Sequence, residues 1–292
     1  MHTLTIAQTN TIYSLLQNSE LDLRDKRGKR HDLCYVFVSL MLALFRNRDG
    51  NLSSIHRSMV NKNVELSQSL GLEIMPVISR SHLPVFLQKV DLSVFTEILF
   101  SFSGIKLDAK QQAWFAMDGK EIQGSIIKGN KRGEAIVLAV SHRGRKVLGQ
   151  KFYSGQKESE KTCLQALLSE SGIEAQKLTM DALHLSPKTV RQIQKSKGVY
   201  LIGLKENQKE LFTTMQKATQ ALPTNSCYSQ VEKGHGRVEQ RQYDTYNIKN
   251  EYLDERWKEA GFQTLVKVNR VMYDCKKKLR ISKLPFIFQI KL

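Results

Sequence analysis

Residues 114–125 read WFAMDGKEIQGS, an apolar run that ends on a carboxylate, Asp118. The pattern returns 63 residues later, where residues 177–186 read KLTMDALHLS and a second Met-Asp step closes a short apolar segment at Asp181. Short apolar runs bounded by glycine and polar residues are typical of buried strands. The sequence therefore predicts two buried strands, each with an aspartate at its end.

The segments around these strands follow a regular order. Three strand-like segments come first, over residues 113–122, 135–144 and 146–155, and glycine and basic residues separate them as in hairpins. Helix-like and strand-like segments then alternate to residue 222. Gly172 marks the end of one helix, and Ser186 with Pro187 marks the start of the next. The order βββαβαβα indicates a mixed α/β sheet of ribonuclease-H-like type.

Residues 1–105 are expected to form a small helical domain. The run LCYVFVSLMLALFRN is long and strongly apolar, which favours a buried helix over a strand. Ser53 or Ser54 is a candidate N-cap for the next helix, and Pro84 suits the first turn of another. The charged stretch DLRDKRGKRHDL, residues 22–33, is either a solvated turn or a loop that contacts DNA.

The two aspartates suggest a metal site. In the predicted order the first strand is central and runs parallel to the strand of Asp181, so both carboxylates should reach the same sheet edge. Neighbouring carboxylates repel and need a cation, and oxygen ligands without His or Cys favour Mg²⁺ or Mn²⁺. Two such ions can promote attack at a phosphodiester. Taken alone, Asp118 is better interpreted as a strand-end or turn residue, since Asp-Gly is an ordinary turn dipeptide; the matching contexts of the two aspartates together favour the metal site.

The charge is unevenly distributed. The 292 residues carry 45 basic and 28 acidic side chains, a net charge of +17. Residues 1–108 account for +2 and residues 109–292 for +15. The positive excess therefore lies in the part of the chain that contains the two aspartates, and it suits a DNA substrate. Four scattered cysteines signal neither a disulfide framework nor a zinc site, and no apolar run approaches the ~20 residues of a membrane span.

Five motifs resemble one known family, the insertion-sequence transposases of the IS-As group, also called H-repeat-associated proteins, of the DDE superfamily. In chain order the motifs read DLRDKRGKRHDL, SRSHLPVFLQKVD, MDGKEIQGS, TMDAL with LKENQ, and EKGHGRVEQRQY. The resemblance implies an N-terminal associated domain over residues 1–105. It also implies a ribonuclease-H-like catalytic domain over 106–292, with Asp118 and Asp181 as catalytic metal ligands for two Mg²⁺ or Mn²⁺ ions and a β-rich insertion after the second aspartate.

The sequence departs from the family pattern at the third acid. In this family the third acid is a glutamate in an HWxIEN helix beyond YDCKK. Here the chain continues after RVMYDCKKK as LRISKLPFIFQIKL, and HWxIEN does not occur. The expectation is a catalytic domain truncated before the third acid, and therefore a defective enzyme. Glu239 is a weak substitute, and an ion pair with a neighbouring arginine is its plainer role.

Several basic residues are candidates for DNA contact. Lys120 shares a strand face with Asp118, and Lys205 closes the LKENQ strand at the same expected edge. Arg237 and Arg241 lie in the GHGRVEQR motif on an expected strand. For each of them a solvated surface position is the alternative, and His184, close to Asp181, is interpreted as a capping or surface group.

Three functions remain open at this point. The first is a transposase that cuts and joins double-stranded DNA at the terminal repeats of its element, as a possible homodimer, in the bacterial cytoplasm and on the nucleoid when DNA-bound. The second is a non-catalytic DNA-binding remnant or interfering protein. The third is a metal-dependent nuclease with a different third ligand. No membrane association is expected.

Overall fold

The protein is described by a computed structural model, and its chain divides into two compact units, Met1–Ile105 and Lys106–Leu292. Each unit has its own hydrophobic core. The structure describes residues 4–290, except 26, 28, 48–49, 104–111, 123–124, 127–128, 130–132, 145, 155–158, 235, 250, 252 and 275–278. The end of the YDCKK segment and the expected domain boundary thus lie outside the described residues.

The N-terminal unit is helical. Its helices are α1 (Ile6–Gln17), α2 (Leu33–Arg46), α3 (Leu52–Ser69), α4 (Leu83–Leu87) and α5 (Leu92–Ser103). The long apolar run forms α2 as expected, and Pro84 lies in the first turn of α4. None of the described helices is both long and apolar enough to cross a bilayer.

The start of α3 differs from the sequence prediction. Its N-cap is Asn51, whose side-chain oxygen accepts a hydrogen bond from the Ser53 backbone N–H at 2.8 Å. Ser54 instead donates its hydroxyl to the Asn51 carbonyl at 2.9 Å. Serine and asparagine are both good caps, so composition alone does not choose between neighbouring positions.

The charged loop at residues 22–33 is held by an internal ion-pair network. Asp22 lies 2.8 Å from the Arg24 guanidinium and 2.9 Å from the Lys29 ammonium. These contacts, the hydrogen bond from Arg24 above all, hold the pKa of Asp22 well below its usual range. Arg24 also stacks over the Phe86 ring at 4.4 Å. Asp22 therefore offsets part of the positive charge of Arg24 and Lys29.

The C-terminal unit has the mixed α/β architecture that the sequence predicts. Its first half consists of β1 (Trp114–Glu121), β2 (Glu134–Ser141), β3 (Val147–Ser154), α6 (Glu160–Ser171), β4 (Lys177–Met180), α7 (Pro187–Lys195), β5 (Val199–Leu204) and α8 (Lys209–Ala221). Ser186 caps α7, and Gly172 ends α6 in the left-handed conformation. β1 pairs antiparallel with β2 and parallel with β4, which pairs parallel with β5.

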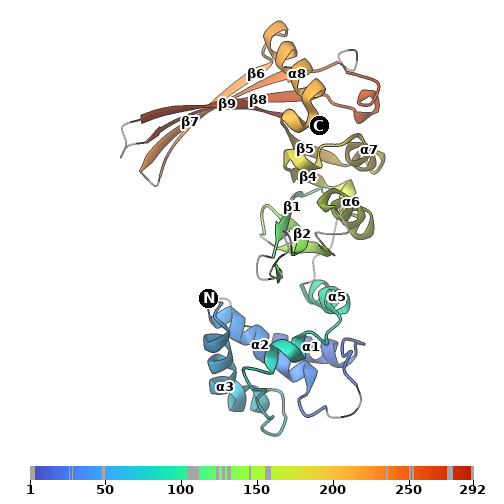
Figure 1. Ribbon diagram of the computed structural model, residues 1–292, viewed down its shortest axis with the longest axis vertical. Helices are drawn as coiled ribbons and strands as arrows, with labels where there is room; N and C mark the ends of the chain where they lie inside the picture. Colours follow the sequence, from blue (N-terminus) through green and yellow to red (C-terminus); the bar gives the residue numbers. More distant parts are fainter. Residues whose placement is uncertain are drawn as a thin grey trace. The chain divides into compact units, whose positions relative to one another are not determined.

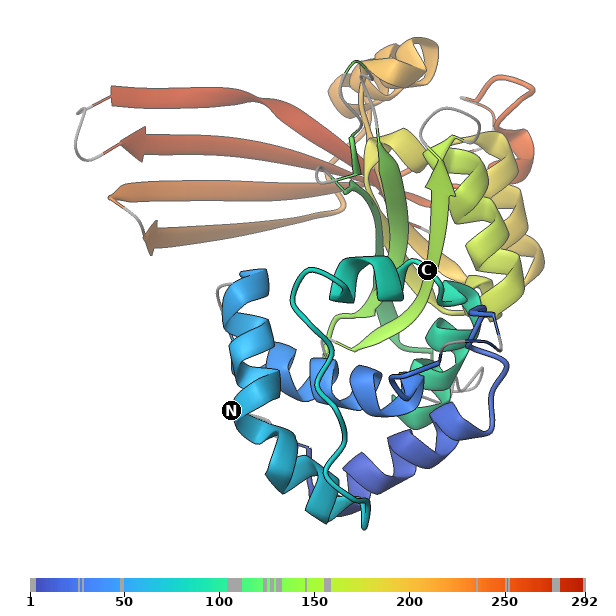
Figure 2. The same cartoon turned by 60° about the horizontal axis from the view of Figure 1, so that its bottom comes forward.

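Four further strands extend the same sheet: β6 (Ser226–Gly234), β7 (Arg237–Asn247), β8 (Thr264–Asp274) and β9 (Leu279–Ile290). The strand order is β3-β2-β1-β4-β5-β9-β8-β7-β6, so the last strand in sequence joins the sheet directly beside β5. The ribbons of β6–β9 project away from α6 and α7 (Figures 1 and 2). The extension therefore continues the sheet past the helices.

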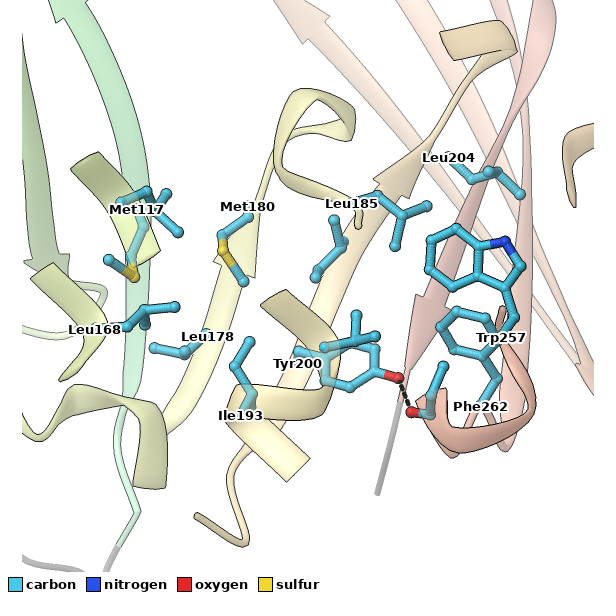
Figure 3. Packing of buried hydrophobic residues seen from close by; sticks show 14 of the residues in the cluster. Met117, Leu168, Leu178, Met180, Leu185, Ile193, Tyr200, Leu204, Trp257 and Phe262 are labelled. Carbon is cyan, nitrogen blue, oxygen red and sulfur yellow. Dashed lines mark hydrogen bonds between the residues drawn. The ribbon is translucent and has the colours of Figure 1, made fainter. Parts of the chain in front are cut away.

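The core of this unit runs under the strands that carry the aspartates. Figure 3 shows a continuous row of buried side chains from Met117 and Leu168 at one end to Trp257 and Phe262 at the other. Tyr200 on β5 is fully buried, and its hydroxyl donates to the Ala260 carbonyl at 2.7 Å. This bond ties β5 to the segment that connects β7 with β8.

Replacing Tyr200 with phenylalanine is expected to lower the free energy of unfolding by about 1–3 kcal/mol, because the buried Ala260 carbonyl loses its donor. Urea unfolding of the full chain measures the change. Tyr228→Phe is the control, since that ring is 63% exposed on β6, and it should change stability by less than ~0.5 kcal/mol. Equal effects in the two variants would contradict the prediction.

Candidate metal centre

The two aspartates follow paired residues on neighbouring parallel strands. Met117 of β1 and Met180 of β4 are register partners, and Asp118 and Asp181 come directly after them. Both aspartates are exposed, whereas both methionines are buried. Because the strands are parallel, the chain delivers both aspartates to the same end of β1 and β4.

The two aspartates lie in different secondary structure. Asp118 remains in β1, opposite Leu138 of β2, and the strand continues through Gly119 to Glu121. The turn interpretation of the Asp-Gly pair is therefore wrong. Asp181 leaves its strand and caps the 3-10 turn η3 (Ala182–His184), accepting the Leu183 backbone N–H at 2.7 Å.

The loop after Asp181 is held from the end of β5. The Asn207 amide donates to the Ala182 carbonyl at 2.7 Å, and the Gln208 amide donates to the Leu185 carbonyl at 3.0 Å. Both amides belong to the LKENQ motif. Its polar residues thus fix the loop that positions Asp181, while Lys205 of the same motif is exposed.

Two residues that the sequence did not single out as ligands join Asp118. Glu160 is the first residue of α6, and His184 ends η3. One donor atom from each of Asp118, Glu160 and His184 lies within 4.8 Å of the other two. His184 Nε2 is 3.0 Å from Glu160 Oε1, and the Tyr153 hydroxyl donates to Glu160 Oε2 at 3.2 Å.

The interpretation of His184 as a surface group is wrong, because the residue is only 1% exposed. Both ring nitrogens are buried: Nε2 faces the Glu160 carboxylate, and Nδ1 has no hydrogen-bond partner among the described residues. Burial lowers the pKa of His184, and the carboxylates of Glu160, Asp181 and Asp118 act in the opposite direction. A buried imidazole surrounded by acids is thus part of this end of the sheet.

Gly119 explains how Glu160 approaches Asp118. A Cβ atom at position 119 would lie 2.2 Å from Cδ of Glu160 and 2.5 Å from its Oε1, so any larger residue would displace the carboxylate. No sequence signal marks Glu160, because acids are ordinary in the first turn of a helix. Its role depends on the missing side chain at Gly119, on a different element.

Comparison with known proteins shows the family of the chain. The model of the Transposase DDE domain family matches residues 109–283, more than half of the chain. The chain belongs to the DDE transposase family. Its mixed α/β sheet fits the ribonuclease-H-like fold of that family.

Relatives of this transposase chain confirm the resemblance to H-repeat-associated proteins. It is 30% identical to "Putative transposase YncI" of Escherichia coli O157:H7 over 158 residues, 51% of this chain and 40% of that protein. It is 28% identical to "H repeat-associated putative transposase YhhI" of Escherichia coli K12 over 155 residues, 51% and 41% of the two chains. "Putative protein YbfL" of the same strain is 29% identical over 155 residues, again 51% and 41%. The match with these relatives spans about two fifths of their length.

The remaining candidate residues of the transposase chain lie on strands. Lys120 is exposed on β1, and Arg237 is exposed at the start of β7. Arg241 is engaged, since its guanidinium lies 2.5 Å from Glu239 and 3.1 Å from Glu232. His235, within the same motif, lies outside the described residues.

Glu239 has two arginine partners. Arg270 on β8 and Arg241 each lie 2.5 Å from its Oε1 atom. Hydrogen bonding from Arg270 is the largest cause that lowers the pKa of Glu239. Glu239 thus has the ion-pair contacts expected as its plainer role. Among the described residues, the acidic and histidine group suited to an ion is instead Asp118, Glu160 and His184.

Proposed function

We propose that the chain cuts and joins double-stranded DNA at the ends of an insertion sequence, with Asp118 and Asp181 as catalytic metal ligands. The observation that carries the proposal is the parallel pairing of Met117 with Met180, which brings the following aspartates to one end of the sheet. The match to the Transposase DDE domain family supports the same chemistry.

The donor set suits divalent cations. Both aspartates are exposed, and the buried His184 ring, which pairs with Glu160, feels the charge of both. Mg²⁺ or Mn²⁺ ions, two in an intact family site, would supply activation of the attacking hydroxyl and stabilisation of the leaving oxygen. The chain itself holds the carboxylates in place, through the strand at Asp118 and through the Asn207 contact behind Asp181.

Basic side chains would hold the DNA backbone. Lys120 lies two residues beyond Asp118 on an exposed strand face and is proposed to approach the scissile phosphate. Lys205 and Arg237, both exposed, are proposed to contact neighbouring phosphates, as is Arg241 once its acidic partners release it. The partner is the terminal repeat of the element, bound by a homodimer in the bacterial cytoplasm or nucleoid.

The domain roles follow from this assignment. Residues 1–105 would be the associated helical domain, and residues 106–292 the catalytic domain. Strands β6–β9 would be the β-rich insertion, here built as an extension of the central sheet.

A metal-dependent nuclease is the second candidate, and the Glu160 carboxylate favours it. A third acid, Glu160, offers an oxygen within 4.8 Å of the Asp118 donor atom. Such a site could hydrolyse DNA without joining ends.

A single assay tests both functions. Labelled duplex DNA with the element ends is incubated with the full chain and Mg²⁺, Mn²⁺ or EDTA. Joined products in metal support transposition, cleaved but unjoined products support the nuclease, and bound but intact DNA would leave only a binding protein.

DNA binding should depend on salt and survive loss of the two aspartates. Residues 109–292 carry 33 basic and 18 acidic side chains, and phosphate contacts release counterions. Between about 50 and about 200 mM salt, affinity should fall by at least about tenfold. The Asp118→Asn, Asp181→Asn variant should bind as tightly as the parent or more tightly in an anisotropy titration. Binding that collapses in this variant would show that metal, not basic surface, holds the DNA.

A further inference from the structure

Three separate elements converge on one point beside β1. Asp118 comes from β1, Glu160 from the first position of α6 and His184 from η3. Their donor atoms all lie within 4.8 Å of one another. An acidic cluster alone would be weak support for a metal site, because carboxylates often gather at sheet ends without an ion.

The histidine supplies a second observation. His184 is 99% buried, yet its Nδ1 atom has no hydrogen-bond partner among the described residues. A buried polar group without a partner is costly, and a missing ion is one of its standard explanations. Its Nε2 atom faces the Glu160 carboxylate at 3.0 Å.

The distance between Nε2 of His184 and Oε1 of Glu160 is that of an ion pair and also fits two ligands of one ion. Ligands about 2.1 Å from an octahedral ion, at right angles to each other, lie about 3.0 Å apart. Behind the proposed ligand, the Tyr153 hydroxyl contacts the second oxygen of Glu160, an outer contact that would orient it. Gly119 leaves the space that the Glu160 carboxylate occupies.

We infer that Glu160 and His184 bind a divalent cation together with Asp118, and that the imidazole makes this site prefer Mn²⁺ to Mg²⁺. Carboxylates suit both ions, but Mg²⁺ is a poor partner for nitrogen and Mn²⁺ tolerates it better. The catalytic meaning of this site rests on the proposed function, whereas metal binding can be measured without DNA.

The experiment is a Mn²⁺ titration of the full 292-residue chain, followed by the electron paramagnetic resonance signal of free Mn²⁺, with Mg²⁺ as competitor. The parent should bind Mn²⁺ more tightly than Mg²⁺. Glu160→Gln should weaken Mn²⁺ binding by at least about tenfold. Glu170→Gln is the matched control on the same helix, where Glu170 is exposed and pairs with Lys151, and its Mn²⁺ affinity should equal that of the parent.

A second variant tests the inference in case Glu160→Gln does not fold. Gly119→Ala leaves Glu160 unchanged but places a Cβ atom where its carboxylate lies, so it should also weaken Mn²⁺ binding. Circular dichroism and the melting temperature without metal report the fold of each variant. Parent-like Mn²⁺ affinity in folded Glu160→Gln, or in folded Gly119→Ala if Glu160→Gln does not fold, overturns the inference.

His184→Gln separates a nitrogen ligand from a hydrogen-bond donor. Glutamine can still donate to Glu160, but it offers an oxygen to the ion in place of nitrogen. The preference for Mn²⁺ over Mg²⁺ should therefore shrink in this variant. An unchanged preference would mean that His184 only positions Glu160, and it would overturn the imidazole part of the inference.

The failure of this inference and that of the proposed function look different. If Mn²⁺ binding depends on Glu160 but the parent leaves DNA intact, the metal site stands and the DNA-cutting function fails. If the parent cuts DNA and Glu160→Gln has parent-like Mn²⁺ affinity, the function stands and the inference fails.

Discussion

A chain with Asp118→Asn and Asp181→Asn is expected to bind DNA but to cut it at least about 10²-fold more slowly than the parent. The two carboxylates follow register partners on adjacent parallel strands, so both substitutions act at one end of the sheet. Asparagine keeps the shape of each side chain and removes its charge, and a neutral amide is a poor ligand for Mg²⁺.

The measurement is the initial rate of strand cleavage on duplex DNA with element ends, at saturating Mg²⁺ and again at saturating Mn²⁺. Glu65→Gln is the matched control, since Glu65 is an exposed acid on α3 that pairs with Lys62. It should cut at the parent rate. Cleavage by the double variant within a few-fold of the parent would show that the catalytic metal lies elsewhere.

The sequence predicted much of the frame of this site, because local chemistry specifies it. The apolar runs that end at Asp118 and Asp181 form the buried parts of β1 and β4. Ser186 and Pro187 marked a helix start, and Gly172 a helix end, through capping rules that depend on a few neighbouring residues.

The rest of the site depends on contacts between distant segments. The Glu160 carboxylate occupies space that a side chain at Gly119, on another element, would fill. His184 resembled any polar residue near a strand end, and its burial follows from the tertiary packing of η3 beside α6. The pairing of β9 with β5 likewise joins segments more than 80 residues apart, which no local pattern encodes.

The largest stability effect is expected at Trp257, which lies at the far end of the core row in Figure 3. The side chain is 1% exposed, and its ring centroid is 5.5 Å from that of Phe262. Trp257→Ala should lower the free energy of unfolding by about 3–5 kcal/mol, because a large aromatic is removed and a cavity remains.

We expect Trp257→Ala to weaken metal binding as well, because the core connects Trp257 to the metal centre. Trp257 and Phe262 pack with Tyr200 of β5, and β5 leads into the Asn207 and Gln208 contacts that hold the loop after Asp181. Urea unfolding followed by circular dichroism measures the stability loss, with Tyr228→Ala as control because that ring is 63% exposed. A Trp257→Ala variant as stable as the control would show that this end of the core does not support the sheet. If Trp257→Ala loses stability as expected but binds Mn²⁺ like the parent under conditions where it remains folded, the packing would stabilise the unit without shaping the site.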